Sequence, residues 1–266
     1  MAKVLVINKW RNIRDISYLQ TADGHHLRAG CLVRGGQLCD ITPRDFEVLE
    51  GYRFEHVFDF RDKEEIENHP DQMFPSALYH PLSPLHLERP ASGEGKKASN
   101  EDNLLRMLSE HADGVGYMER FYRALVLEES SRSAYREFFR VLSEKPCEKV
   151  YWHCSQGKDR AGLASFYLEY ALGVKLEDCV SDYLYSNVAM NRRIRTLSPL
   201  VFLKAPLGKK RKALRIINDV FSVKEAYLRG ALKIIDESFG GLDSFLAKEL
   251  EVNLEGLRKS YLVEPR

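Results

Sequence analysis

The ten residues HCSQGKDRAG, running from His153 to Gly162, connect two apolar segments of the chain. The run Lys149–His153 is short and apolar, as is typical of a buried strand. The longer run Ala161–Leu172 is typical of a helix, which Gly173 would end. A helix therefore begins at or just after Arg160. This strand–loop–helix unit predicts an α/β fold, in which helices flank a small central sheet.

The connecting loop has the composition of an anion site. It carries Cys154 and Arg160 at the spacing C-x5-R, immediately before a helix. Consecutive backbone N–H groups in a tight loop, together with a helix N-terminus, attract phosphate or another oxyanion. Gly157 lets the backbone turn where a side chain would obstruct it. The guanidinium of Arg160 can bind two phosphate oxygens, and the same positive field favours a Cys154 thiolate.

Two other interpretations of this loop are open to test. A single cysteine at a strand end is often buried and inert, although only Cys154 of the five cysteines has an arginine six residues further on. The pair Gly157-Lys158 also suggests the nucleotide-binding motif G-x4-G-K-[ST]. That motif fails at two required positions, where this chain has Trp152 and Asp159.

The remaining pattern places strands mainly before the loop and helices mainly after it. We expect one domain over residues 1–266, with a candidate lid insertion at 83–116 and a mobile loop at 91–100. The expected strands are His25–Leu27, Cys31–Arg34, His56–Arg61 and Ala77–Tyr79. The expected helices cover 43–49, two apolar-periodic segments between Tyr117 and Pro146, Val223–Phe239, Leu242–Leu250 and Leu254–Leu262.

Composition excludes several classes of protein. The hydrophobic fraction is 44%, the charged fraction is 30% and the formal net charge is +1, which argues against a nucleic-acid-coating protein or an acidic disordered chain. No apolar run approaches the roughly 18 residues of a membrane helix. Five cysteines without a CxxC pair, and no signal-peptide core, favour a reducing cytoplasm. The eight histidines show no ligand spacing, so we expect neither a metal nor a cofactor.

The loop resembles the signature HCxxGKDR[TS]G of an atypical bacterial group of cysteine-dependent protein tyrosine phosphatases. The resemblance extends to Asn12–Asp15, Gly30–Leu38, the strand His56–Arg61 with Glu64-Glu65 after it, and the C-terminal helical segments. It implies a phosphatase-like domain whose phosphate-binding loop lies between a strand and a helix. It also implies a phosphoric monoester hydrolase in which Cys154 forms a cysteinyl-phosphate and Arg160 binds the phosphoryl oxygens.

The proton donor differs from that of most tyrosine phosphatases. The only tryptophans are Trp10 and Trp152, and neither lies in the WPD-type loop from which most tyrosine phosphatases take their acid. In the atypical group the loop aspartate, here Asp159, is the candidate general acid. A purely structural role, such as an ion pair with Lys158, is the alternative. Asp59, Asp102 and Asp113 are the substitute donors.

Other loop residues are assigned by the same resemblance. Ser155, Gln156, Gly157, Lys158 and Ala161 would line the substrate site. Ala161 stands where the group usually has a hydroxyl residue that helps the second step, so turnover could be slow, and Ser155 is a conceivable replacement. His153 is expected to fix the loop by hydrogen bonding a neighbouring carbonyl, while Asp59 and Arg61 are expected to orient it.

A basic stretch follows the loop in sequence. Residues 191–215 contain nine Lys or Arg and no acid, so the rest of the chain has 31 bases against 39 acids and a net charge of −8. Such a run is usually a solvated helix face or loop. It could instead contact anionic surfaces, and with Lys158 it fits a phosphoinositide phosphatase. The substrates are therefore phosphotyrosine proteins or phosphoinositides, and a phospho-binding pseudophosphatase is the non-enzymatic alternative.

Overall fold

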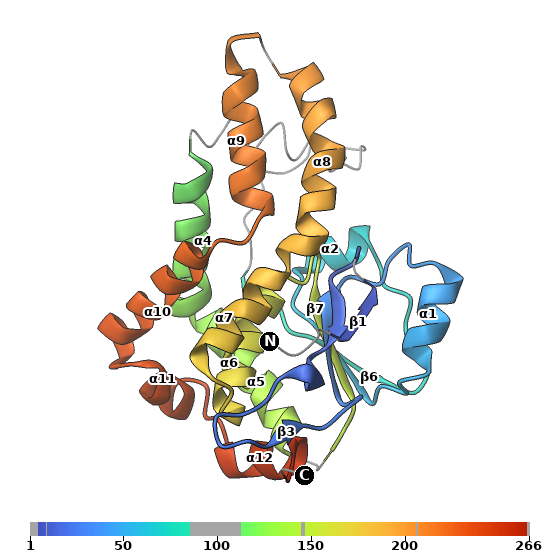
Figure 1. Ribbon diagram of the computed structural model, residues 1–266, viewed down its shortest axis with the longest axis vertical. Helices are drawn as coiled ribbons and strands as arrows, with labels where there is room; N and C mark the ends of the chain where they lie inside the picture. The colour runs from blue at the N-terminus through green and yellow to red at the C-terminus, as the bar shows by residue number, and fades with distance from the viewer. Residues whose placement is uncertain (1–4, 9, 86–112, 145–146, 206, 265–266) are drawn as a thin grey trace.

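The computed structural model describes residues 5–8, 10–85, 113–144, 147–205 and 207–264, and in these the predicted α/β fold is confirmed. A six-stranded sheet has the order β1-β2-β4-β7-β5-β6, and helices flank it on both sides (Figure 1). The strands β4, β7, β5 and β6 are parallel, whereas β1 and β2 are antiparallel additions at one edge. The strands of this sheet are β1 (Leu5–Asn8), β2 (Ile13–Asp15), β4 (Leu32–Gly36), β5 (His56–Asp59), β6 (Leu78–Pro81) and β7 (Val150–Cys154).

The parallel strands alternate their side chains between two cores, as a period of two requires. Tyr151 packs in a smaller core with α1 (Pro43–Glu50), whose first turn is capped by Thr42. Its neighbours Val150 and Trp152 pack in the larger core on the opposite face. There lie the helices α4 (Gly114–Leu127), α5 (Glu129–Glu144), α6 (Arg160–Leu172), α7 (Leu176–Tyr185), α10 (Glu225–Phe239), α11 (Leu242–Lys248) and α12 (Leu254–Tyr261).

Several boundaries differ from those expected. The third expected strand ends at Asp59 instead of Arg61, because the backbone N–H of Arg61 donates to the Asp59 carboxylate at 2.9 Å and not to the neighbouring strand. The strand β6 runs on to Pro81, which lies at the sheet edge where its missing N–H is tolerated. The strands β1 and β2, the capped helix α2 (Lys63–Asn68) and the helix α7 were not predicted.

The C-terminal segment returns to an early part of the chain. A second, two-stranded sheet pairs β3 (His26–Leu27) with β8 (Leu262–Val263). The C-terminal segment also contacts the end of α6, where the guanidinium of Arg258 donates to the Leu172 carbonyl at 2.7 Å. Most of the expected lid insertion at 83–116, and the expected mobile loop at 91–100, lie outside the described residues.

The basic stretch forms a helical hairpin that extends along the long axis of the molecule (Figure 1). It consists of α8 (Asn187–Lys204), the short 3-10 helix η2 (Leu207–Lys209) and α9 (Lys210–Phe221). Its charge predicts only a solvated helix face or a loop, whereas the stretch forms two long helices with a short 3-10 helix between them. No helix among the described residues has the length and apolar character needed to cross a membrane.

Candidate active site

The loop between β7 and α6 turns tightly against the neighbouring strand β4. Gly157 has φ of +65°, a conformation that favours glycine. A Cβ atom there would lie 2.2 Å from the carbonyl oxygen of Gly35, so no other residue fits without a shift of the backbone. Cys154 is the last residue of β7 and is 3% exposed, and Arg160 is the first residue of α6. The turn therefore brings the cysteine to the N-terminus of a helix.

Hydrogen bonds from elsewhere in the fold determine which way the loop amides point. Three consecutive carbonyls, those of residues 155–157, accept hydrogen bonds on the core side. The first accepts from the backbone N–H of Gln37 at 3.4 Å, and the second from the side chain of Asn12 at 3.3 Å. The third accepts from Asn12 at 2.9 Å and from Arg34 at 3.0 Å. In a trans peptide the N–H points opposite to the carbonyl, so the amides of residues 156–158 face away from these donors. Three amides aimed together form an anion-binding nest.

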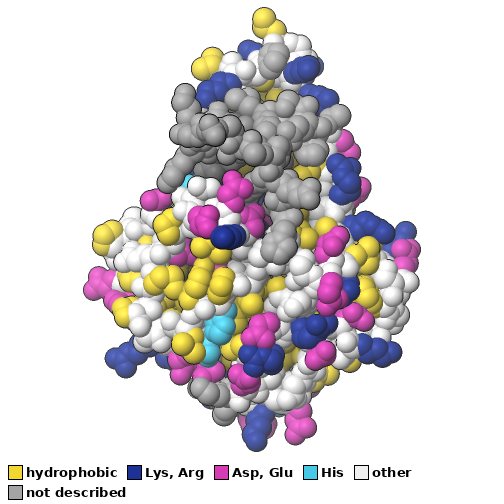
Figure 2. All heavy atoms as spheres, turned by 180° about the vertical axis from the view of Figure 1, so that it is seen from behind, with side chains coloured by type: hydrophobic (Ala, Val, Ile, Leu, Met, Phe, Trp, Pro, Cys, Tyr) yellow, Lys and Arg dark blue, Asp and Glu magenta, His cyan; other side chains and the backbone are white. Residues whose placement is uncertain are grey.

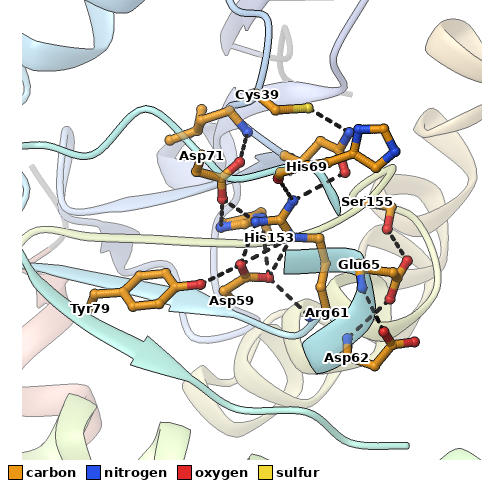
Figure 3. A network of polar contacts seen from close by, with 12 residues as sticks. Cys39, Asp59, Arg61, Asp62, Glu65, His69, Asp71, Tyr79, His153 and Ser155 are labelled. Atoms are coloured by element: carbon orange, nitrogen blue, oxygen red, sulfur yellow. Dashed lines mark hydrogen bonds and ion pairs between the residues drawn. The ribbon is translucent and has the colours of Figure 1, made fainter. Parts of the chain in front are cut away.

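Arg160 is held at this nest by a carboxylate from α2. Its guanidinium makes two contacts with Glu65, at 2.5 and 3.0 Å, and a third with the hydroxyl of Ser155 at 3.3 Å. The Ser155 hydroxyl in turn donates to Glu65 (Figure 3). Burial would lower the pKa of Arg160, but Glu65 raises it well above its usual value. Burial would also raise the pKa of Glu65, but Arg160 holds it below its usual value. Both groups are therefore ionised.

A second buried charge cluster lies beneath the loop. Asp182 of α7 accepts from Arg14 at 2.7 Å and from Arg34 at 2.6 Å, and all three side chains are at most 1% exposed. Burial would raise the pKa of Asp182, but the two arginines hold it below its usual value. Glu169 is also buried, and burial followed by the charge of Asp182 raises its pKa well above the usual range, so it is neutral. Two cations and one anion leave net positive charge under the loop.

A third cluster surrounds His153 (Figure 3). The imidazole lies between two carboxylates, 3.7 Å from Asp59 and 3.2 Å from Asp71, instead of bonding a carbonyl as expected. The guanidinium of Arg61 binds both of these carboxylates at 2.6 Å. Three potential metal ligands, from His153, Asp59 and Asp71, lie within 4.8 Å of one another. A metal ion there would compete with the arginine for the same oxygens.

Asp59 is poorly suited to donate a proton. Its side chain is fully buried, and Tyr79 donates to it at 2.7 Å. Burial would raise the pKa of Asp59, but His153 and then Arg61 hold it below its usual value. Of the other substitute donors, Asp113 caps α4 by accepting from two backbone N–H groups, and Asp102 lies outside the described residues.

Asp159, the residue before the start of α6, takes part in a separate network of polar contacts. Tyr122 donates to it at 2.8 Å, and Tyr122 also shares a hydrogen bond with Tyr183 at 2.7 Å. The ammonium of Lys158 lies 2.9 Å from Asp159 and donates to the carbonyl of Val220 at 2.7 Å. Val220 is in the last turn of α9, where the helix dipole favours a cation. Lys158 was expected beside the phosphate, but its ammonium joins the loop to the basic hairpin. Asp159 forms the ion pair with Lys158 that was the structural alternative to a role as general acid.

The two remaining loop residues are largely enclosed. Ala161 is fully buried in the first turn of α6, and its carbonyl accepts from the hydroxyl of Ser165 at 2.8 Å. The side-chain oxygen of Gln156 is buried and has no hydrogen-bond partner among the described residues. Ser155, considered as a replacement for the missing hydroxyl after the arginine, uses its own hydroxyl to bind Glu65.

Sequence reasoning gave no role to the residues that support the loop from a distance. Asn12, Arg14 and Arg34 were noticed only as parts of matching segments, and Asp182 was not noticed. The sequence did carry one signal for α2, because Asp62 and Glu65 form a capping box of the pattern D-x-x-E. That pattern predicts where the helix starts but not that Glu65 contacts Arg160.

The chain is similar to known proteins over nearly its whole length. A family model described as "Tyrosine phosphatase family" matches residues 5–263. A protein of Cupriavidus necator named "Putative tyrosine-protein phosphatase" is 29% identical over 253 residues, which cover 94% of this chain and 85% of that protein. The "Triple specificity protein phosphatase PtpB" of Mycobacterium tuberculosis is 24% identical over 254 residues, covering 88% of this chain and 90% of that protein.

Proposed function

The chain belongs to the tyrosine phosphatase family and is a phosphatase enzyme, and we propose that the loop 153–161 is its active site. Cys154 is the nucleophile, Arg160 binds the phosphoryl group, and the amides of residues 156–158 bind its oxygens. The observation that carries this assignment is the set of three loop carbonyls tied to the core, because it leaves three consecutive amides facing away from the core next to the helix N-terminus.

The proposed reaction has two steps. The Cys154 thiolate attacks phosphorus, an S–P bond forms, and the P–O bond to the leaving group breaks. Water then attacks the cysteinyl-phosphate, which releases inorganic phosphate and regenerates the thiolate. The guanidinium of Arg160 and the loop amides stabilise the charge that develops on the phosphoryl oxygens in both steps. Glu65 contributes by positioning Arg160, which it contacts at 2.5 and 3.0 Å.

Asp159 is the proposed proton donor to the leaving group. It is a side chain of the loop itself and is partly exposed, whereas Asp59 is fully buried and ion-paired. To act, its carboxyl must exchange the contact with Lys158 for one with the substrate oxygen. Asp159→Asn tests this role. A kcat for phosphotyrosine peptide within a few-fold of wild type would exclude it, whereas a fall of about 100-fold is expected for a general acid.

The substrate class is proposed as phosphotyrosine proteins, with phosphoinositides as the second candidate. The basic hairpin favours the second, and the mycobacterial relative is itself named for triple specificity. Phosphate release from a panel of phosphopeptides and phosphoinositides separates them, with Cys154→Ser as the control. Turnover of para-nitrophenyl phosphate by wild type but not by Cys154→Ser is expected. Turnover that persists in Cys154→Ser would refute the assigned nucleophile.

The organisation and location of the chain are also part of the proposal. One domain over 1–266 is supported by the pairing of β3 with β8, which joins residues 26–27 to residues 262–263. A cytoplasmic location is supported by five free cysteines, four of them buried, since disulfides are rare in reducing compartments. Contact of 191–215 with anionic surfaces is proposed from its charge.

A further inference from the structure

The tip of the basic hairpin exposes apolar side chains that the fold does not need. Leu203, at the end of α8, is 79% exposed, and Leu207, at the start of η2, is 91% exposed. They have the largest exposed fractions among the large hydrophobic side chains that the structure describes. Figure 2 shows hydrophobic side chains at this end of the molecule among Lys and Arg. A fully exposed leucine at a protruding tip gains nothing from folding, because it stays in water.

Basic side chains surround these leucines. Residues 204–212 contain five bases, namely Lys204, Lys209, Lys210, Arg211 and Lys212, and the sequence has no Asp or Glu anywhere from 183 to 218. The ammonium of Lys210 lies 4.6 Å from the ring centre of Phe202, a cation–π contact that places a positive charge directly beside the apolar surface of the tip. Such a combination of apolar tip and cationic flanks is the pattern of a surface that enters the headgroup region of an anionic bilayer.

The roots of the hairpin are fixed, which makes the tip a defined projection from the active-site side. Next to the start of α8, the hydroxyl of Ser186 accepts from Asn12 at 3.1 Å, and Asn12 also binds the Gly157 carbonyl. At the end of α9, Val220 accepts from Lys158. Twelve residues of α9 place the tip roughly 18 Å from this root. The loop and the tip therefore lie at opposite ends of one hairpin that rises from the candidate active site (Figure 1).

We propose that the α8–α9 tip is a membrane anchor, in which Leu203 and Leu207 insert into an anionic lipid bilayer while the surrounding bases bind its headgroups. A bilayer fits this surface better than a protein does, because the tip is a narrow convex end with adjoining like charges. The anchor would determine where the enzyme acts, at a bilayer surface, and not which reaction it catalyses. It rests on exposure and charge alone and does not depend on the chemistry assigned to Cys154.

Sedimentation of the full chain with vesicles tests the anchor. One set of vesicles is phosphatidylcholine alone, and the other contains phosphatidylserine as about a third of the lipid. Wild type is expected to bind the anionic vesicles at least about tenfold more tightly. Leu203→Gln/Leu207→Gln is expected to lose at least about tenfold of that affinity, and each of Lys209→Gln and Arg211→Gln about fivefold. Leu78→Gln/Leu254→Gln is the matched control, since these leucines are 61% and 47% exposed elsewhere in the fold.

Each outcome decides for or against the anchor. Equal binding to both kinds of vesicle, or no binding above background, would overturn it. A leucine double variant that binds as tightly as wild type would overturn insertion. Vesicle binding that is absent while a phosphotyrosine peptide binds in a Lys209-dependent manner would assign the tip to protein docking instead. All variants are checked for unchanged turnover of para-nitrophenyl phosphate, and Cys154→Ser is run with the vesicles so that loss of catalysis and loss of membrane binding are separated.

Discussion

Replacing Glu65 with glutamine removes the negative charge that holds Arg160 while keeping the size and one acceptor oxygen of the side chain. The pair is largely enclosed, with side chains 13% and 9% exposed. At an effective dielectric constant of about 20, two charges about 4 Å apart attract each other by about 4 kcal/mol. The retained oxygen and the lower burial cost of a neutral amide recover part of this loss. We therefore expect the free energy of unfolding to fall by about 2 kcal/mol, or roughly 4 to 8 °C in melting temperature.

Activity is expected to fall because Glu65 no longer holds the guanidinium of Arg160 in position. If about 2 kcal/mol of transition-state binding is lost, kcat/KM falls roughly 30-fold at pH 7. Inorganic phosphate should also inhibit the variant less strongly, because the same guanidinium binds it. Steady-state kinetics with para-nitrophenyl phosphate and thermal melts measure both effects. Glu64→Gln is the matched control, since Glu64 is the exposed neighbour on the same helix and loses the same charge.

The sign of the pH dependence follows from the depressed pKa of Glu65. A carboxyl whose pKa is lower in the folded than in the unfolded state contributes stability above the unfolded value, about 4.3, and loses it as the pH falls through the folded value. The stability gap between wild type and Glu65→Gln should thus be full at pH 7 and narrow below about pH 4. A Glu65→Gln enzyme whose kcat/KM stays within twofold of Glu64→Gln, with an equal melting temperature, would refute this role for Glu65.

Three further substitutions probe the support of the loop. Gly157→Ala should abolish turnover of para-nitrophenyl phosphate, because its Cβ would lie 2.2 Å from the Gly35 carbonyl; full activity would contradict the described turn. Asp182→Asn should lower the free energy of unfolding by about 3 kcal/mol or more in urea titrations, because it leaves two buried arginines without their carboxylate; an unchanged midpoint would argue against that network. Thr42→Ala should cost only about 1 kcal/mol, through loss of the cap of α1, and should leave kcat/KM unchanged.

Local signals were enough to find the central strands and the loop. The apolar runs of β5 and β7 are continuous because both faces of these strands are buried, so the run itself identifies them. The strands β1 and β2 lie at the sheet edge, and two of the three residues of β2 are charged side chains that the fold buries, Arg14 and Asp15, so β2 does not read as an apolar strand. The helices of the hairpin were hidden by charge and by Pro199 within α8.

The candidate site was predictable only as far as it is contiguous in sequence. Cys154, Gly157 and Arg160 lie within one short motif, and the conformation of that loop places them together. The contacts of Glu65 and Asp182 join residues 95 and 168 positions apart, so they depend on how α2 and α7 pack, which no local pattern encodes. Clusters of this kind require the tertiary structure.

The tethered carbonyls of residues 155–157 determine when the ordering of the loop occurs. Fixing the backbone of one residue costs about 1 to 2 kcal/mol in conformational entropy, so a free loop of three residues would cost about 3 to 6 kcal/mol to organise around each arriving anion. Here Gln37, Asn12 and Arg34 hold those peptides through hydrogen bonds already made in the folded chain. The conformational entropy of these residues is lost once, when the protein folds, and the loop is already ordered when each anion binds.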